Sequence, residues 1–92
     1  MKTVKSGNTD NHSSGMAFGN VLRRLRQNRG LSQEALGFES GHHRTYISLL
    51  ERGKKSPSLQ TIFNLSKALK IEPSELIGQV YELLQTKHAG IE

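Results

Sequence analysis

The side chains best suited to chemistry lie in one short stretch between residues 44 and 52. At about 100° per residue in a helix, Ile47 and Leu50 nearly share a direction and face a core. The outward residues are then Thr45, Ser48, Leu49 and Arg52, with Arg44 flanking them. Arginine can bind guanine through two acceptors, hydroxyl groups can donate or accept, and leucine can meet a thymine methyl. This face predicts a fit to the major groove of duplex DNA.

Other chemistries find little support in the sequence. The chain has no cysteine, which excludes disulfides, thiolate nucleophiles and zinc sites of the cysteine type. It shows no carboxylate pair, nucleophile–base pair or phosphate loop, and Ser58 is interpreted as a helix cap because no base is suitably spaced. His42 and His43 diverge by about 100° on a helix and lack a third ligand nearby, so we expect no metal. We expect no enzyme, no cofactor and no small-molecule substrate.

The charge is concentrated in the middle of the chain. The formal net charge is +5, and residues 16–56 carry eight basic side chains against three glutamates. A central basic segment is typical of a phosphate-binding face, although many basic surfaces are merely solvated. No apolar run approaches the ~18 residues that span a membrane, so we expect a cytoplasmic protein with no membrane partner.

The apolar pattern predicts an all-α fold, a compact bundle of five short helices. Residues 1–15 hold one aliphatic side chain and are predicted to form a disordered arm, either a plain tail or a basic arm along DNA. The first helix starts at Met16 and ends at Gly30. The folded domain is predicted over 16–86, followed by a tail over 87–92.

The remaining helices follow from caps and turns. Ser32 is predicted to cap a second helix, Gln33–Ser40, and a third runs from about His43 to Arg52. Ser58 caps a fourth helix, and Pro73 opens the fifth. Two helices joined by a tight glycine turn form a recognised unit of structure.

Two glycines and one glutamine have predicted roles in this unit. Gly37 weakens the second helix but lets the third approach closely, and Gly41 supplies the positive φ of the turn. Gln33 stands at the start of the second helix, where backbone N–H groups and a side-chain amide can contact a phosphate.

Two motifs follow each other along the chain: L-R-x-x-x-G-L-S-Q-E-x-L, from Leu25 to Leu36, and R-T-Y-I-S-x-L-E-R-G-K-x-S-P-S-L, from Arg44 to Leu59. In this order they resemble the Xre/Cro class of helix-turn-helix regulators, which includes phage repressors and the controller proteins of restriction–modification systems. The similarity covers about Phe18 to Ile77, roughly two-thirds of the chain. It implies a lambda-repressor-like fold and a DNA-binding regulator of transcription.

The resemblance also implies a role for single positions. It assigns base contacts to Arg44, Thr45 and Leu49, and less firmly to Ser48. The implied phosphate contacts are Gln33, His43, Arg52 and Lys54. Arg26 and Glu51 are expected to form an internal ion pair. Two positions depart from the family: Gly37 replaces the usual alanine, and His42 replaces an apolar turn residue, so the turn is either looser or buries an imidazole.

The fifth helix suggests a homodimer that reads a palindromic operator. If Leu76, Val80 and Leu84 face the body, then Ile77 and Tyr81 remain as surplus apolar surface. The other reading is that both fold back on the same core. An alternative function is an antitoxin or protein-interaction module that uses the same bundle to bind a partner protein.

Overall fold

The computed structural model describes the backbone of residues 7–91 and the side chains of residues 14–86. Its five helices are α1 (Gly7–Asn28), α2 (Gln33–Ser40), α3 (Arg44–Glu51), α4 (Leu59–Leu69) and α5 (Pro73–Ile91). The described range contains no strand, so the predicted all-α fold of five helices is confirmed. None of the helices in this range is both long enough and apolar enough to cross a membrane.

The caps fix where the short helices begin and end. The Ser32 hydroxyl accepts a hydrogen bond from the Ala35 backbone N at 2.9 Å, and Ser58 does the same for Thr61 at 3.0 Å. Both predicted caps are therefore confirmed. Gly41 ends α2 with a φ of 80°, the left-handed conformation expected of a tight turn. Ser32 and Gly41 thus limit α2 to eight residues, the same length as α3.

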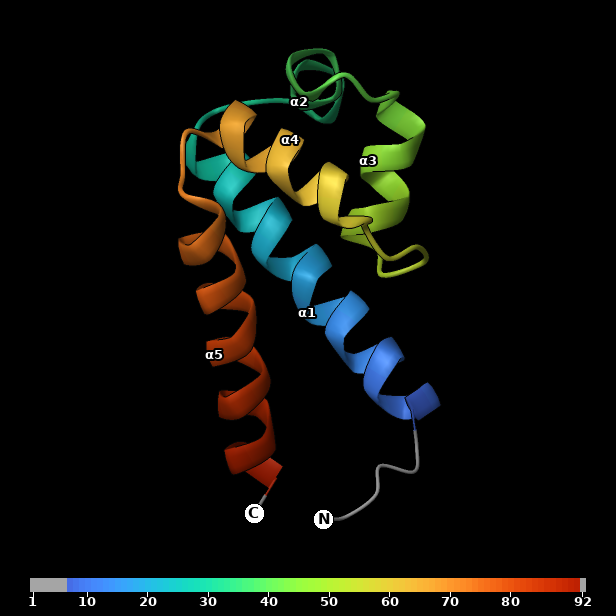
Figure 1. Cartoon of the computed structure of the whole chain (residues 1–92), viewed down its shortest axis with the longest axis vertical. Coiled ribbons are helices and arrows are strands. Elements are labelled where there is room, and N and C mark those ends of the chain that lie inside the picture. Colours follow the sequence, from blue (N-terminus) through green and yellow to red (C-terminus); the bar gives the residue numbers. More distant parts are fainter. Residues whose placement is uncertain (1–6, 92) are drawn as a thin grey trace.

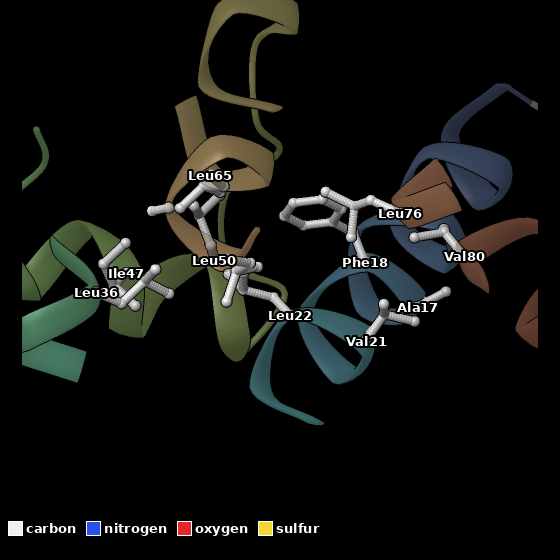
Figure 2. Close-up of a cluster of buried hydrophobic side chains, with 12 residues drawn as sticks. Ala17, Phe18, Val21, Leu22, Leu36, Ile47, Leu50, Leu65, Leu76 and Val80 are labelled. Carbon is white, nitrogen blue, oxygen red and sulfur yellow. The ribbon is translucent and has the colours of Figure 1, made fainter. Parts of the chain in front are cut away.

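The helices surround one apolar core (Figure 2). Leu36 of α2 and Ile47 of α3 meet at one end of this core, while Leu76 and Val80 of α5 lie beside Phe18 of α1 at the other. The fully buried aliphatic side chains are Val21, Leu22, Leu36, Ile47, Leu50, Leu65 and Leu76. Burying each contributes about 1.5–3 kcal/mol, so this cluster is the main force that orients α3.

Figure 1 shows how the core arranges the helices. The shorter helices α2, α3 and α4 gather at one end, and the first turns of α1 and the last turns of α5 extend toward the other. The helix pairs in contact include α1 with α3, α1 with α5, and α2 with α3 and α4. The predicted close approach at Gly37 is confirmed, because a Cβ there would lie 2.6 Å from the His42 carbonyl oxygen.

The outer ends of the first and last helices differ from the predicted boundaries. Helix α1 begins at Gly7 rather than at Met16, so it includes part of the stretch over 1–15 for which an arm is predicted; residues 1–6 lie outside the described part. Helix α5 continues to Ile91, past the predicted boundary at 86. Apolar periodicity detects only the helical turns that pack on a core. Once a helix has formed, further turns can be added beyond the core at little additional cost in free energy.

Candidate nucleic-acid interface

Helix α3 divides its side chains between the core and the solvent. Ile47 and Leu50 are fully buried, while Arg44 and Thr45 at the start of the helix are exposed. Ser48 and Leu49 are half-buried on the same outward side. The four residues that sequence predicts to contact bases are therefore accessible to different degrees, with Arg44 and Thr45 the most open.

The two ends of α3 carry polar side chains with defined partners. His43 caps the helix, and its Nδ1 accepts a hydrogen bond from the Thr45 backbone N at 3.0 Å. In the neutral imidazole this leaves the hydrogen on Nε2, which can donate outward. At the other end, Arg52 is exposed and its Nε donates to the Ser48 hydroxyl at 3.3 Å. Arg52, a predicted phosphate contact, is therefore hydrogen-bonded to Ser48, a predicted base contact.

Glu51 is the centre of a network that joins α1, α2 and α3. Its side chain is fully buried and accepts two bonds from Arg26, from Nε to Oε2 at 2.6 Å and from Nη2 to Oε1 at 3.0 Å. Arg26 Nη1 also donates to the Leu31 carbonyl at 2.8 Å. The structure therefore brings the two residues of the expected ion pair into a bidentate contact, which is the strong geometry for such pairs.

The network keeps both partners ionised. Burial raises the pKa of Glu51 and is the largest single influence on it. The hydrogen bonds from Arg26 and Gln33, with the nearby positive charges, together outweigh burial and hold this pKa below its ordinary value. The hydrogen bond to Glu51 raises the pKa of Arg26 despite some desolvation. Glu51 is therefore a charged anchor for the end of α3 at neutral pH.

Gln33 lies at the start of α2, and Lys54 lies in the loop that follows α3. The Gln33 side-chain nitrogen donates to Glu51 Oε1 at 3.0 Å, so this amide is partly committed to the network. One hydrogen of that nitrogen remains, together with the backbone N–H groups at the start of α2. Lys54 is exposed, and its backbone N donates to the Leu49 carbonyl at 2.9 Å, which fixes the loop after α3.

The capped α2, the glycine turn and the half-exposed α3 lie within a stretch of sequence that matches a known family. The model of a helix-turn-helix family, HTH_3, matches residues 22–76. The chain belongs to this helix-turn-helix family. The predicted resemblance to helix-turn-helix regulators is thereby confirmed.

Three similar proteins place the chain within the family. Control protein C.BamHI of Bacillus amyloliquefaciens is 44% identical over 63 residues, which cover 67% of this chain and 78% of that protein. The crystal structure of the restriction–modification controller C.AhdI of Aeromonas hydrophila is 50% identical with a TM-score of 0.66, covering 67% and 94% of the two chains. The DNA-binding domain of the P22 c2 repressor is 33% identical with a TM-score of 0.63, covering 65% and 79%.

Two aromatic side chains of the helix-turn-helix have structural partners. The Tyr46 hydroxyl donates to the Thr61 hydroxyl at 3.4 Å, which supports a packing role for this tyrosine. The His42 ring lies 5.0 Å from the Tyr46 ring, and its Nε2 is buried with no hydrogen-bond partner among the described residues. The His42 side chain is half-buried, and the burial of its Nε2 favours the second of the two possibilities at this turn.

Sequence reasoning missed two residues of this helix-turn-helix. A Cβ on Gly19 of α1 would clash with the carbonyl groups at the end of α3, so this glycine sets the distance between the two helices. Arg23 Nε lies 3.5 Å from Glu51 Oε1. The signal for Arg23 is its position three residues before Arg26, which places both on one helix face. The sequence gives no comparable signal for Gly19.

Helix α5, which packs on α1 and α4, presents apolar side chains to solvent. Leu76 and Val80 are buried, whereas Ile77 is 44% exposed and Tyr81 is 60% exposed. Leu84 is half-buried rather than fully buried as its predicted inward position suggests. Ile77 and Tyr81 are therefore accessible for an interface, as the predicted homodimer requires.

Proposed function

We propose that the chain is a sequence-specific regulator of transcription that inserts α3 into the major groove of double-stranded DNA. The observation that carries the proposal is the division of α3, in which Ile47 and Leu50 are fully buried while Arg44 and Thr45 stand exposed. A helix anchored by one face presents the other as a rigid reading surface. One of the similar proteins is the DNA-binding domain of the P22 c2 repressor, which agrees with this use.

Within this proposal the side chains divide between bases and backbone. Arg44, Thr45, Ser48 and Leu49 read base edges, because they lie on the outward face of α3. Gln33, His43, Arg52 and Lys54 bind phosphates, since they lie at the ends of α2 and α3 or in the following loop. The Arg26–Glu51 pair contacts no DNA in this scheme and holds the reading helix in place.

The regulator acts as a homodimer on a palindromic operator. One recognition helix reads only a few base pairs, whereas two helices related by a twofold axis read half-sites about one helical turn apart. Exposed Ile77 and Tyr81 on α5 support a self-complementary interface. Occupying such an operator would control transcription from the promoter that contains it.

Selection of bound sequences from a random duplex pool tests the proposal. The expected result is enrichment of an inverted repeat with half-sites about 10 base pairs apart, and an affinity that falls steeply with salt. The matched control is Arg44→Ala together with Thr45→Ala, two exposed changes that remove base contacts and leave the core intact. Absence of any enriched sequence with the wild-type protein would contradict the proposal.

A protein-binding function is the second candidate, and one observation favours it. Phe38 on α2 is 87% exposed, so a large aromatic side chain is available to a partner protein. A partner that covers Phe38 would co-purify with the wild-type chain and be lost with Phe38→Ser. Purification of the chain alone, with specific DNA binding, would favour the regulator.

A further inference from the structure

Arg23 lies beside the network of Glu51 but is not held by it. Its Nε is 3.5 Å from Glu51 Oε1, longer than an ordinary hydrogen bond, and its side chain is 53% exposed. Arg26 differs, because it makes three short hydrogen bonds and its side chain is only 11% exposed. Two arginines on the same face of α1 therefore have different surroundings, one enclosed and one open to solvent.

The charges of this network do not cancel. Arg26 meets the Glu51 carboxylate in a bidentate pair, so the two neutralise each other. Arg23 is the second cation on that single carboxylate, which leaves one positive charge in excess. Since the Glu51 side chain is fully buried and Arg23 is half-exposed, solvent and any ligand meet the cation first. The outer rim of the network is therefore attractive to an anion.

Arg23 also lies close to the predicted phosphate contact at the start of α2. Gln33 Nε2 and Arg23 Nε both lie within 3.5 Å of the same oxygen, Glu51 Oε1. The Gln33 nitrogen keeps one hydrogen to donate, and the Arg23 guanidinium keeps its two terminal NH2 groups. A single phosphate, with several acceptor oxygens, can accept from both side chains at once.

We infer that Arg23 is a further DNA-phosphate ligand that acts with Gln33 on one backbone phosphate per half-site. The inference rests on the proposed function, because it needs α3 in the major groove beside that phosphate. It adds a contact from α1 to those from α2, α3 and the following loop. Glu51 positions this contact, since its carboxylate holds the Gln33 amide and attracts the Arg23 guanidinium.

Salt dependence of DNA affinity separates Arg23 from a merely structural residue. Fluorescence anisotropy on a selected duplex and on a random duplex would compare wild type, Arg23→Ala and Arg23→Lys. The matched control is Arg24→Ala, which removes a neighbouring exposed arginine whose Nη2 donates to Gln79 of α5 at 2.6 Å. We expect Arg23→Ala to reduce the slope of log K against log salt by about 0.9 per protomer on both duplexes. Arg23→Lys keeps the wild-type slope, and Arg24→Ala does not change it.

A scan with neutral methylphosphonate linkages locates the contact. Replacing one phosphate at a time should reveal one position per half-site that weakens wild type more than it weakens Arg23→Ala, in which Gln33 alone still contacts that phosphate. An Arg23→Ala slope parallel to wild type, even with weaker binding, would overturn the inference and leave Arg23 as a structural partner of Glu51. If wild type itself shows no salt-dependent DNA binding, then the proposed function fails as well, so the two failures are distinguishable.

Discussion

Gly19 of α1 lies directly against the carbonyl group of Glu51 at the end of α3, where a Cβ on Gly19 would be 2.6 Å from the Glu51 oxygen. Contacts this short do not occur for real Cβ atoms, and the obstructing atoms are backbone, which cannot turn aside as a side chain can. The distance between α1 and α3 is therefore set by the absence of a side chain at position 19. Any larger residue at position 19 must push the two helices apart.

The first prediction is that Gly19→Ala destabilises the fold. Alanine improves helix propensity by up to about 1 kcal/mol, but overpacking at a rigid contact costs about 1–3 kcal/mol. The matched control is Gly78→Ala on α5, where nothing lies within 4 Å of the added Cβ, so this change should stabilise. Urea unfolding at one protein concentration measures both. Stabilisation by Gly19→Ala would show that α1 and α3 are not in this close contact.

The second prediction concerns the Arg26–Glu51 pair. Removing one partner strands the other charge in a shielded position, so Arg26→Ala and Glu51→Ala should each lower the free energy of unfolding by about 3–5 kcal/mol. The double variant closes the cycle and should cost clearly less than the sum of the two. Arg24→Ala, which removes only an exposed hydrogen bond to Gln79, should cost less than about 1 kcal/mol. If each single variant lowered the free energy of unfolding by less than about 1 kcal/mol, the pair would be a solvated one.

The third prediction is a loss of stability in acid that Glu51 controls. Its pKa in the folded chain lies below the ordinary 4.5, so the unfolded chain binds this proton more tightly. The stabilisation is thus fully present above about 4.5 and is lost as the pH falls through the lower folded pKa. The advantage of wild type over Glu51→Gln should be largest at neutral pH and shrink toward pH 3. A constant difference across that range in urea melts would contradict this assignment.

Periodicity and capping chemistry account for the parts of the fold that the sequence predicts well. Ile47 and Leu50 recur at helical spacing, so the buried face of α3 and its outward face follow from the order of residues. Ser32 and Ser58 cap their helices because a hydroxyl at that position meets a free backbone N–H group. These are local effects between residues a few positions apart, which one sequence records directly.

Contacts between distant segments are harder to predict. The partner of Gly19 is thirty or more residues away on α3, and nothing near position 19 indicates which backbone lies opposite. The Arg26–Glu51 pair could be expected only because a family resemblance supplied its spacing, and Arg23, on the same helix face, was missed. The first turns of α1 were missed because they lack the large apolar residues that make a pattern.

The fourth prediction separates base reading from phosphate binding at the two ends of α3. Arg44→Ala should cost about 1–3 kcal/mol on the selected duplex and relax discrimination at one or two positions per half-site. Its matched comparison is Arg52→Ala, another exposed arginine, which should weaken selected and random duplexes alike and flatten the salt slope. Binding to both duplexes over a salt series measures these effects. Equal losses on the two duplexes for Arg44→Ala would exclude a base-reading role.

The last prediction concerns assembly through α5. Ile77 and Tyr81 are 44% and 60% exposed and lie four residues apart, so they form one apolar patch on the helix surface. Pairing this patch with its twin on a twofold axis would remove both side chains from water and would hold two copies of α3 at a fixed separation. A charge at the centre of such an interface would lose its hydration on association, so Tyr81→Asp or Ile77→Asp should give a folded monomer that binds half-sites weakly.

The control for this experiment is Phe38→Asp, which places the same charge at a side chain that is 87% exposed on α2, outside the proposed interface. Sedimentation at micromolar concentration should show a dimer for wild type and Phe38→Asp, and a monomer for the two α5 variants. Circular dichroism would verify that all four chains remain helical, because each substitution lies at an exposed position. A wild-type chain that sediments as a monomer and binds full sites without cooperativity would exclude the dimer. The proposed groove-reading role of α3 would be unaffected, since that proposal rests on the core packing of Ile47 and Leu50.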